Sequence, residues 1–145
     1  MFQGRVEAEM GFVTPFYDEN FSLSEQRETL LNLYFAYCIR ALKINGNYSC
    51  IFTLSREKFG IETTGSCNYR EKKIFVYSKN RAFSDILRTV AHELVHISQH
   101  EDDIFLNKSL HFSSESEDEA TKKSGELLSA FGQVVGFNAI YEGKR

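Results

Sequence analysis

The segment His92-Glu93-Leu94-Val95-His96 places two histidines four residues apart, with a glutamate directly after the first. On an α-helix, residues four apart lie one turn apart on one face, so both imidazoles can reach one tetrahedral ion. Glu93 lies about 100° around the helix from His92, where its carboxylate can reach a metal-bound water. A carboxylate in that place can take the water's proton and then pass it to a leaving amine. The motif predicts hydrolysis with Glu93 as the general base and acid.

Two histidines and a carboxylate suit Zn²⁺ better than other common divalent ions. A catalytic zinc takes three protein ligands and leaves one position open, so one ligand must come from further along the chain. Glu119 is the first choice, because it lies in the first turn of a helix expected over residues 115–135. Glu115 and Glu117 on the same turn are alternatives, and so is His111 in the polar segment 101–114. Small residues at Ala120 and Ser124 would let the two helices approach closely.

The histidines belong to a helix expected over residues 81–100, whose two sides differ in polarity. At about 100° per residue, the side that carries both histidines is polar and the opposite side is apolar. The polar side holds Asp85, Arg88 and Gln99, and the apolar side holds Phe83, Leu87, Val90 and Leu94. This pattern predicts a helix that packs on the core and forms the floor of a cleft.

The remaining patterns predict an α+β fold, with a small antiparallel sheet packed on about three helices. Residues 22–44 have the apolar spacing of a helix, which begins with a capping box of Ser22 and Glu25. Tyr48–Leu54 and Lys73–Ser78 read as strands, with a hairpin arm before the second. The terminal segments are less regular: a short strand is expected over Arg5–Val13 within residues 1–20, and an extended segment over the tail, 136–145.

Length and composition set limits on the classes of protein to consider. The 145 residues make one domain, 1–145, with 42% hydrophobic residues and a net charge of −3. This charge gives no basic footprint for nucleic acid, and no apolar run approaches the roughly 20 residues of a membrane span. The cysteines Cys38, Cys50 and Cys67 have no paired spacing and read as reduced thiols, which favours the cytoplasm. The expected partner is a peptide or protein substrate.

Two stretches of the sequence resemble known metallopeptidases. Residues 86–99 (ILRTVAHELVHISQ) are similar to the metal-binding helix of zincins, and residues 117–120 (EDEA) to the Glu-x-Glu-Ala segment of gluzincin-type members. In that segment the glutamate before alanine is the third zinc ligand, which the resemblance assigns to Glu119. The run 73–96 also resembles small SprT-like HExxH proteins of tailed bacteriophages. The similarity covers roughly residues 65–132 and implies a minimal zincin-like peptidase.

The sequence also departs from these families. Thermolysin-like gluzincins have an aspartate four residues after the third ligand, where this chain has Lys123, so another residue must orient the histidine. SprT-type proteases use a downstream histidine as the third ligand, and His111 has a spacing that fits. The candidates for stabilising a tetrahedral oxyanion are Tyr69, Tyr77 and Tyr141. A catalytically inactive, metal-stabilised binding or regulatory module is the alternative function, and a fourth protein ligand would favour it.

Overall fold

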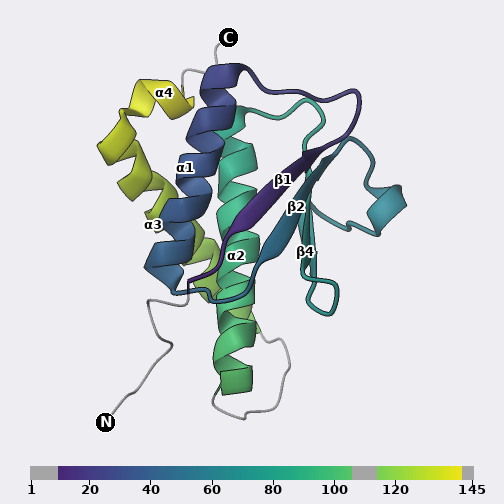
Figure 1. Ribbon diagram of the computed structural model, residues 1–145, viewed down its shortest axis with the longest axis vertical. Coiled ribbons are helices and arrows are strands. Elements are labelled where there is room, and N and C mark those ends of the chain that lie inside the picture. The colour runs from purple at the N-terminus through teal and green to yellow at the C-terminus, as the bar shows by residue number, and fades with distance from the viewer. Residues whose placement is uncertain (1–9, 106–113, 142–145) are drawn as a thin grey trace.

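A computed structural model describes residues 10–105 and 114–141 of the chain. It has the α+β fold that the sequence predicts, with a four-stranded sheet lying beside the helices (Figure 1). The elements in chain order are β1 (Val13–Tyr17), α1 (Glu25–Leu42), β2 (Tyr48–Thr53), the 3-10 turn η2 (Glu57–Phe59), β3 (Gly65–Asn68), β4 (Lys73–Tyr77), α2 (Phe83–Phe105), α3 (Ser114–Val135) and α4 (Phe137–Tyr141).

The sheet is mixed rather than antiparallel, which corrects the prediction. Its order is β1-β2-β4-β3; β1 pairs with β2 and β2 with β4 in parallel, and only β3 pairs with β4 in the antiparallel sense. The reason is the connection through α1, because a helix between two adjacent strands returns the chain to the same end of the sheet. The tight turn after β3 makes the one hairpin of the described strands and leaves β3 at the edge of their sheet.

The pleat of the strands decides which residues meet the helices. Cys50 pairs with Ile74, and Phe52 pairs with Val76, and all four are fully buried in the core. On the edge strand, Gly65 pairs with Val76 and Cys67 with Ile74. Residues paired across a sheet point to the same face. The edge strand therefore turns Gly65 and Cys67 toward α2.

Helix α2 is fixed at both its centre and its far end. Leu87, Val90 and Leu94 on its apolar side are completely buried, as the polarity of the sequence predicts. Near its end, the Glu101 carboxylate accepts hydrogen bonds from the backbone N–H groups of Asn45 and Gly46 at 2.8 and 2.9 Å, and from the Tyr48 hydroxyl at 2.8 Å. These bonds hold α2 against the turn between α1 and β2.

Several predicted boundaries shift. Helix α1 begins after Ser24, whose side chain accepts from the N–H of Arg27, so the predicted cap at Ser22 is wrong by two residues. A strand lies at Val13–Tyr17, so the predicted strand Arg5–Val13 meets it only at Val13 and is wrong over residues 10–12; its residues 5–9 lie outside the described part. The tail forms α4 instead of an extended segment up to Tyr141, because Gly136 at φ 96° ends α3 and lets a new turn start.

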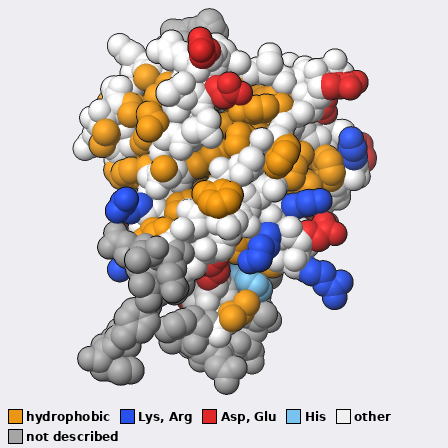
Figure 2. All heavy atoms as spheres, viewed as in Figure 1, with side chains coloured by type: hydrophobic (Ala, Val, Ile, Leu, Met, Phe, Trp, Pro, Cys, Tyr) orange, Lys and Arg blue, Asp and Glu red, His pale blue; other side chains and the backbone are white. Residues whose placement is uncertain are grey.

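The surface carries apolar as well as charged side chains. Figure 2 shows hydrophobic side chains spread over much of one face, with acidic and basic side chains mostly around its margin. Phe12 and Phe16, at the β1 edge, are 59% and 51% exposed. Among the helices of the described residues, none combines the length and apolar character needed to cross a membrane.

Candidate metal centre

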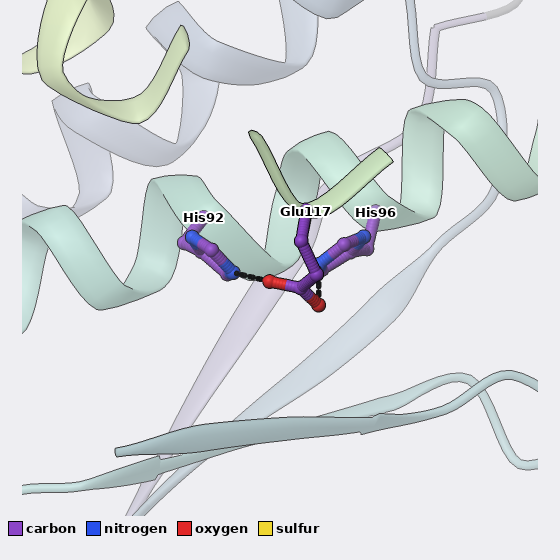
Figure 3. Close-up of side chains that lie close together, drawn as sticks. All are labelled: His92, His96 and Glu117. Atoms are coloured by element: carbon purple, nitrogen blue, oxygen red, sulfur yellow. Dashed lines mark hydrogen bonds and ion pairs between the residues drawn. The ribbon is translucent and has the colours of Figure 1, made fainter. Parts of the chain in front are cut away.

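Three side chains from two helices converge beside the sheet. His92 and His96 lie on α2, and Glu117 lies on the first turn of α3, with its carboxylate between the two rings (Figure 3). Oε1 of Glu117 lies 3.2 Å from Nε2 of His92, and Oε2 lies 3.0 Å from Nε2 of His96. Zinc–nitrogen bonds of about 2.0 Å at tetrahedral angles would separate the ligand atoms by about 3.3 Å. Both distances to Glu117 are close to this value, and one ligand atom from each of the three residues lies within 4.8 Å of the others, so the group could hold a metal ion.

Glu117, rather than Glu119, supplies the carboxylate because of how α3 packs on α2. Ala120 and Ser124 are buried on α3, at 0% and 1% exposure. Around a helix, Glu117 lies only about 20° from Ser124, whereas Glu119 lies about 140° away. The small residues do permit the close approach expected of them, and that approach turns Glu117 toward the histidines. Glu119, the first choice from the sequence, is not part of the group.

Glu119 instead holds the side chain that orients His96. Gln99 donates its Nε2 hydrogens to Oε1 of Glu119 at 2.7 Å and to the Ser116 carbonyl at 3.0 Å. The bond from Gln99 is the main cause that keeps the pKa of Glu119 below its usual value despite partial burial. A smaller contribution comes from Lys123, whose Nζ lies 3.2 Å from Oε2 of Glu119. Gln99 in turn places its Oε1 2.9 Å from Nδ1 of His96. Glu119 thus acts on His96 through Gln99.

These contacts determine where the His96 ring carries its proton. The two groups bonded to Nε2 of Gln99 are both acceptors, so this atom is the amide nitrogen and the amide oxygen Oε1 faces His96. Nδ1 of His96 must therefore carry a proton and donate it to that oxygen. Nε2 of the same ring lies only 3.0 Å from Oε2 of Glu117. Two lone pairs at that distance repel unless a cation, either a proton or a metal ion, lies between them. A metal ion shared by both groups would fit this arrangement around a side chain that is 5% exposed.

Glu93 follows His92 on α2 and faces the edge strand. It is 8% exposed, and Oε1 of its carboxylate lies 3.1 Å from the Cys67 thiol, which donates to it. Burial raises the pKa of Glu93 above its usual value, although the thiol and the two imidazoles act in the opposite direction. Burial beside Glu93 raises the pKa of Cys67 as well, so the thiol remains protonated as the donor. The carboxylate is held beside the three residues that could hold a metal ion (His92, His96 and Glu117, called the metal group below) without belonging to them.

Gly65 is what allows the edge strand to come so close to Glu93. A Cβ at this position would lie 2.8 Å from Cγ2 of Thr89 and 2.9 Å from Oε2 of Glu93. Both separations are shorter than the roughly 3.5–4.0 Å of a favourable contact between heavy atoms. Only glycine therefore fits where β3 passes over α2.

Two adjoining hollows open on this group of side chains. A cleft of about 500 Å³ is lined by His92, Glu93, His96 and Glu117 on one side and by Gly65, Cys67 and Tyr69 of the edge-strand region on the other. A second hollow of about 380 Å³ shares His92, Glu93 and Glu117 and continues toward the start of α2. As the sequence predicts, the motif helix lines the floor of a cleft, which extends to both sides of the metal group.

The other residues singled out in the sequence are spread over different places. Tyr69 lines the cleft and stacks on His100, with ring centroids 4.2 Å apart. Tyr77 lies under Arg56, and Tyr141 is on α4. Glu115 is exposed on α3 outside the group, and His111 lies outside the described residues.

Sequence reasoning missed the contributions of Gln99, Gly65 and Cys67 to the site. The position of Gln99 three residues after His96 was the available signal, because such residues are neighbours on a helix. Contacts of Glu93 with the edge strand leave no comparable mark in the sequence.

Comparisons of the chain with known protein families, with curated proteins and with solved structures found no match.

Proposed function

We propose that this protein is a zinc-dependent metallopeptidase. The observation that carries the proposal is the convergence of His92, His96 and Glu117, with Nε2 of His96 3.0 Å from the Glu117 carboxylate and Nδ1 held by Gln99. A proton between Nε2 and the carboxylate would make a purely structural pair, and metal analysis distinguishes the two cases. The bond from Nδ1 to Gln99 matches an imidazole that is oriented by a second partner in order to ligate a metal.

His92, His96 and Glu117 would hold the zinc ion through two nitrogens and one carboxylate oxygen. When bound there, zinc supplies Lewis-acid chemistry, which makes water acidic enough to attack near neutral pH. Glu93 does the proton work. Its carboxylate accepts the proton of the attacking water and delivers it to the amine that leaves when the C–N bond breaks. The Cys67 thiol holds that carboxylate in place from the side of the sheet.

The substrate we propose is a peptide segment in an extended conformation. Strand β3 is the edge of the described sheet, and its residues line the cleft next to Glu93. An edge strand offers backbone N–H and C=O groups to an added strand, so β3 can align a peptide along the cleft. Cys38, Cys50 and Cys67 are free thiols, and we place the protein in the cytoplasm on that basis.

The test is a comparison of the wild type with Glu93→Gln in metal content and in hydrolysis. Glu93→Gln should retain about one zinc per chain by plasma mass spectrometry, while cleavage of fluorescein-labelled casein falls by about 10²–10⁴-fold. His96→Ala should lose both the metal and the activity. Glu115→Gln is the matched control, since it neutralises an exposed acid on α3 that lies outside the metal group.

Two results would overturn the proposal. Wild-type protein that carries no zinc after purification and after reconstitution would remove the metal site. Protein that carries zinc and cleaves neither casein nor other unfolded proteins would favour the metal-stabilised binding module.

A further inference from the structure

The hollow that continues from the metal group toward the start of α2 has a basic residue in its wall. Arg81 lines it, together with Thr89 of α2 and Thr121 and Ser124 of α3. Three bonds fix the guanidinium: Nη1 donates to the Tyr77 carbonyl at 2.8 Å, and Nη2 donates to the Asp85 carbonyl at 3.1 Å and to Oγ1 of Thr89 at 2.9 Å. The head group is therefore held in one orientation before any ligand arrives.

All three acceptors of Arg81 are neutral oxygens. In the described part of the chain, no carboxylate lies within ion-pair distance of it. The nearby Asp85 carboxylate lies 3.7 Å from Arg88, and it acts on Arg81 only through its charge at longer range. An arginine has five N–H donors, and these bonds use three of them. A half-buried guanidinium thus brings a positive charge and unused donors to the wall of the hollow. Its own neighbours there are mostly hydroxyl groups, whereas Glu93 and Glu117 lie at the end next to the histidines and Asp85 and Arg88 complete the lining.

The spacing of Thr89 and Glu93 along α2 sets the distance from the Arg81 guanidinium to the bond that would be cleaved. Thr89, which touches Arg81, lies one turn before Glu93, and one turn is about 5.4 Å along the helix. An extended peptide advances about 3.3 Å per residue. A substrate group that reaches Arg81 therefore belongs to a residue within about two positions of the bond that Glu93 serves.

We propose that Arg81 forms a specificity pocket for a carboxylate of the substrate, close to the scissile bond. A carboxylate matches the planar fork of an arginine and can accept two hydrogen bonds from it. The group is the side chain of an aspartate or glutamate, or the free C-terminus of a peptide. The role in cleavage rests on the proposed peptidase function, whereas recognition of the carboxylate can be measured separately by binding.

The experiment measures binding to zinc-treated Glu93→Gln protein, so that cleavage does not interfere. The probes are fluorescein-labelled, C-terminally amidated alanine hexapeptides with a single glutamate or a single glutamine at each position in turn. A neutral hexapeptide with a free C-terminus, compared with its amide, tests the other source of the carboxylate. We expect one glutamate position, or the free C-terminus, to bind about tenfold more tightly than its neutral partner, as a charge-assisted pair in a partly dry pocket gives.

Substitutions then assign the preference to Arg81. Arg81→Gln in the same background should abolish the difference between charged and neutral peptides, and Arg81→Lys should keep part of it. Arg56→Gln is the matched control: Arg56 stacks on Tyr77 near Arg81 but does not line the hollow, so the preference should persist. A purely structural Arg81 would change stability and leave the ratio between paired peptides unaltered.

Three outcomes would overturn the inference. These are equal binding of all charged and neutral pairs, an undiminished preference in Arg81→Gln, and loss of the preference in Arg56→Gln. If Arg81→Gln does not fold, the peptide series on the parent protein and on Arg81→Lys still decides. Hydrolysis of casein by wild type is scored independently, so a failure of the peptidase proposal is distinguishable from a failure of this pocket.

Discussion

The contact between the edge strand and Glu93 predicts a large effect from the smallest possible substitution, Gly65→Ala. The added methyl group would meet Cγ2 of Thr89 at 2.8 Å and Oε2 of Glu93 at 2.9 Å. Thr89 is β-branched, buried and bonded to Arg81, so its side chain cannot turn away without cost. The clash therefore falls on Glu93 and on the spacing between β3 and α2.

The magnitude follows from two opposing terms. Overpacking of this kind costs about 1–3 kcal/mol, and the alanine recovers up to about 1 kcal/mol by restricting the unfolded chain. We expect a net loss of about 1–2 kcal/mol in the free energy of unfolding, which lowers Tm by about 3–8 °C in a chain of this size. A displacement of Glu93 by about 1 Å should reduce cleavage by about 100-fold. Zinc affinity should hardly change, because the metal group does not touch Gly65.

The assays are urea unfolding, zinc titration and casein cleavage on Gly65→Ala and on a matched control. Gly125→Ala adds the same methyl group inside α3, where nothing lies within 4 Å of the new Cβ. It should stabilise the protein by about 0.5–1 kcal/mol and leave cleavage unchanged. If Gly65→Ala is as stable and as active as wild type, the close approach of β3 to Glu93 is refuted, and with it the positioning of the general base by the edge strand.

Two further predictions concern Gln99, the second partner of His96, and the buried thiol of Cys38. Gln99→Leu should weaken zinc binding by about 10–100-fold in a competitive chelator titration, because His96 loses the group that fixes its tautomer. The control Lys123→Gln leaves Gln99 in place and should bind zinc like wild type. Equal affinities of all three proteins for zinc would contradict the role of Gln99. Burial raises the pKa of Cys38 to about 12, so its contribution to stability is complete below the pKa of the unfolded thiol, near 8.5, and is lost as the pH rises from there toward 12. The free energies of unfolding of wild type and Cys38→Ala should therefore converge between pH 8 and pH 11 in urea titrations, and a constant difference would contradict the shift.

Local patterns predicted the elements of the fold better than the way they pair. The apolar spacing of the helices and the β-branched and aromatic strands needs only neighbouring residues, so α1, α2, α3, β2 and β4 lie close to where the sequence places them. The parallel pairing of β1 with β2 depends on where α1 returns the chain, which is a property of the assembled layers. For this reason the sequence supported an α+β fold but led to the wrong strand direction.

The third member of the metal group illustrates the same division. Two histidines on one helix are placed by the geometry of that helix alone, and the structure brings them together. The carboxylate depends on the rotation of α3 against α2. The resemblance to gluzincins pointed to Glu119, while the helical positions of Ala120 and Ser124 point to Glu117. A helical wheel drawn for α3 as well as for α2 would have distinguished these two glutamates.

The candidate site and the packing of the last long helix depend on the same contacts. Ser116 and Glu119 of α3 both accept from Gln99 of α2, and that bond pair fixes the rotation that brings Glu117 to the histidines. One turn of α3 therefore carries both kinds of residue. Glu117 belongs to the candidate metal group, and Ser116 and Glu119 on either side of it hold α3 against α2. A change that shifts this turn must disturb the tautomer of His96 and the position of the Glu117 carboxylate together, since Gln99 is bonded to both the ring and the turn. The geometry of the candidate site is thus set by helix packing as much as by the HExxH motif itself.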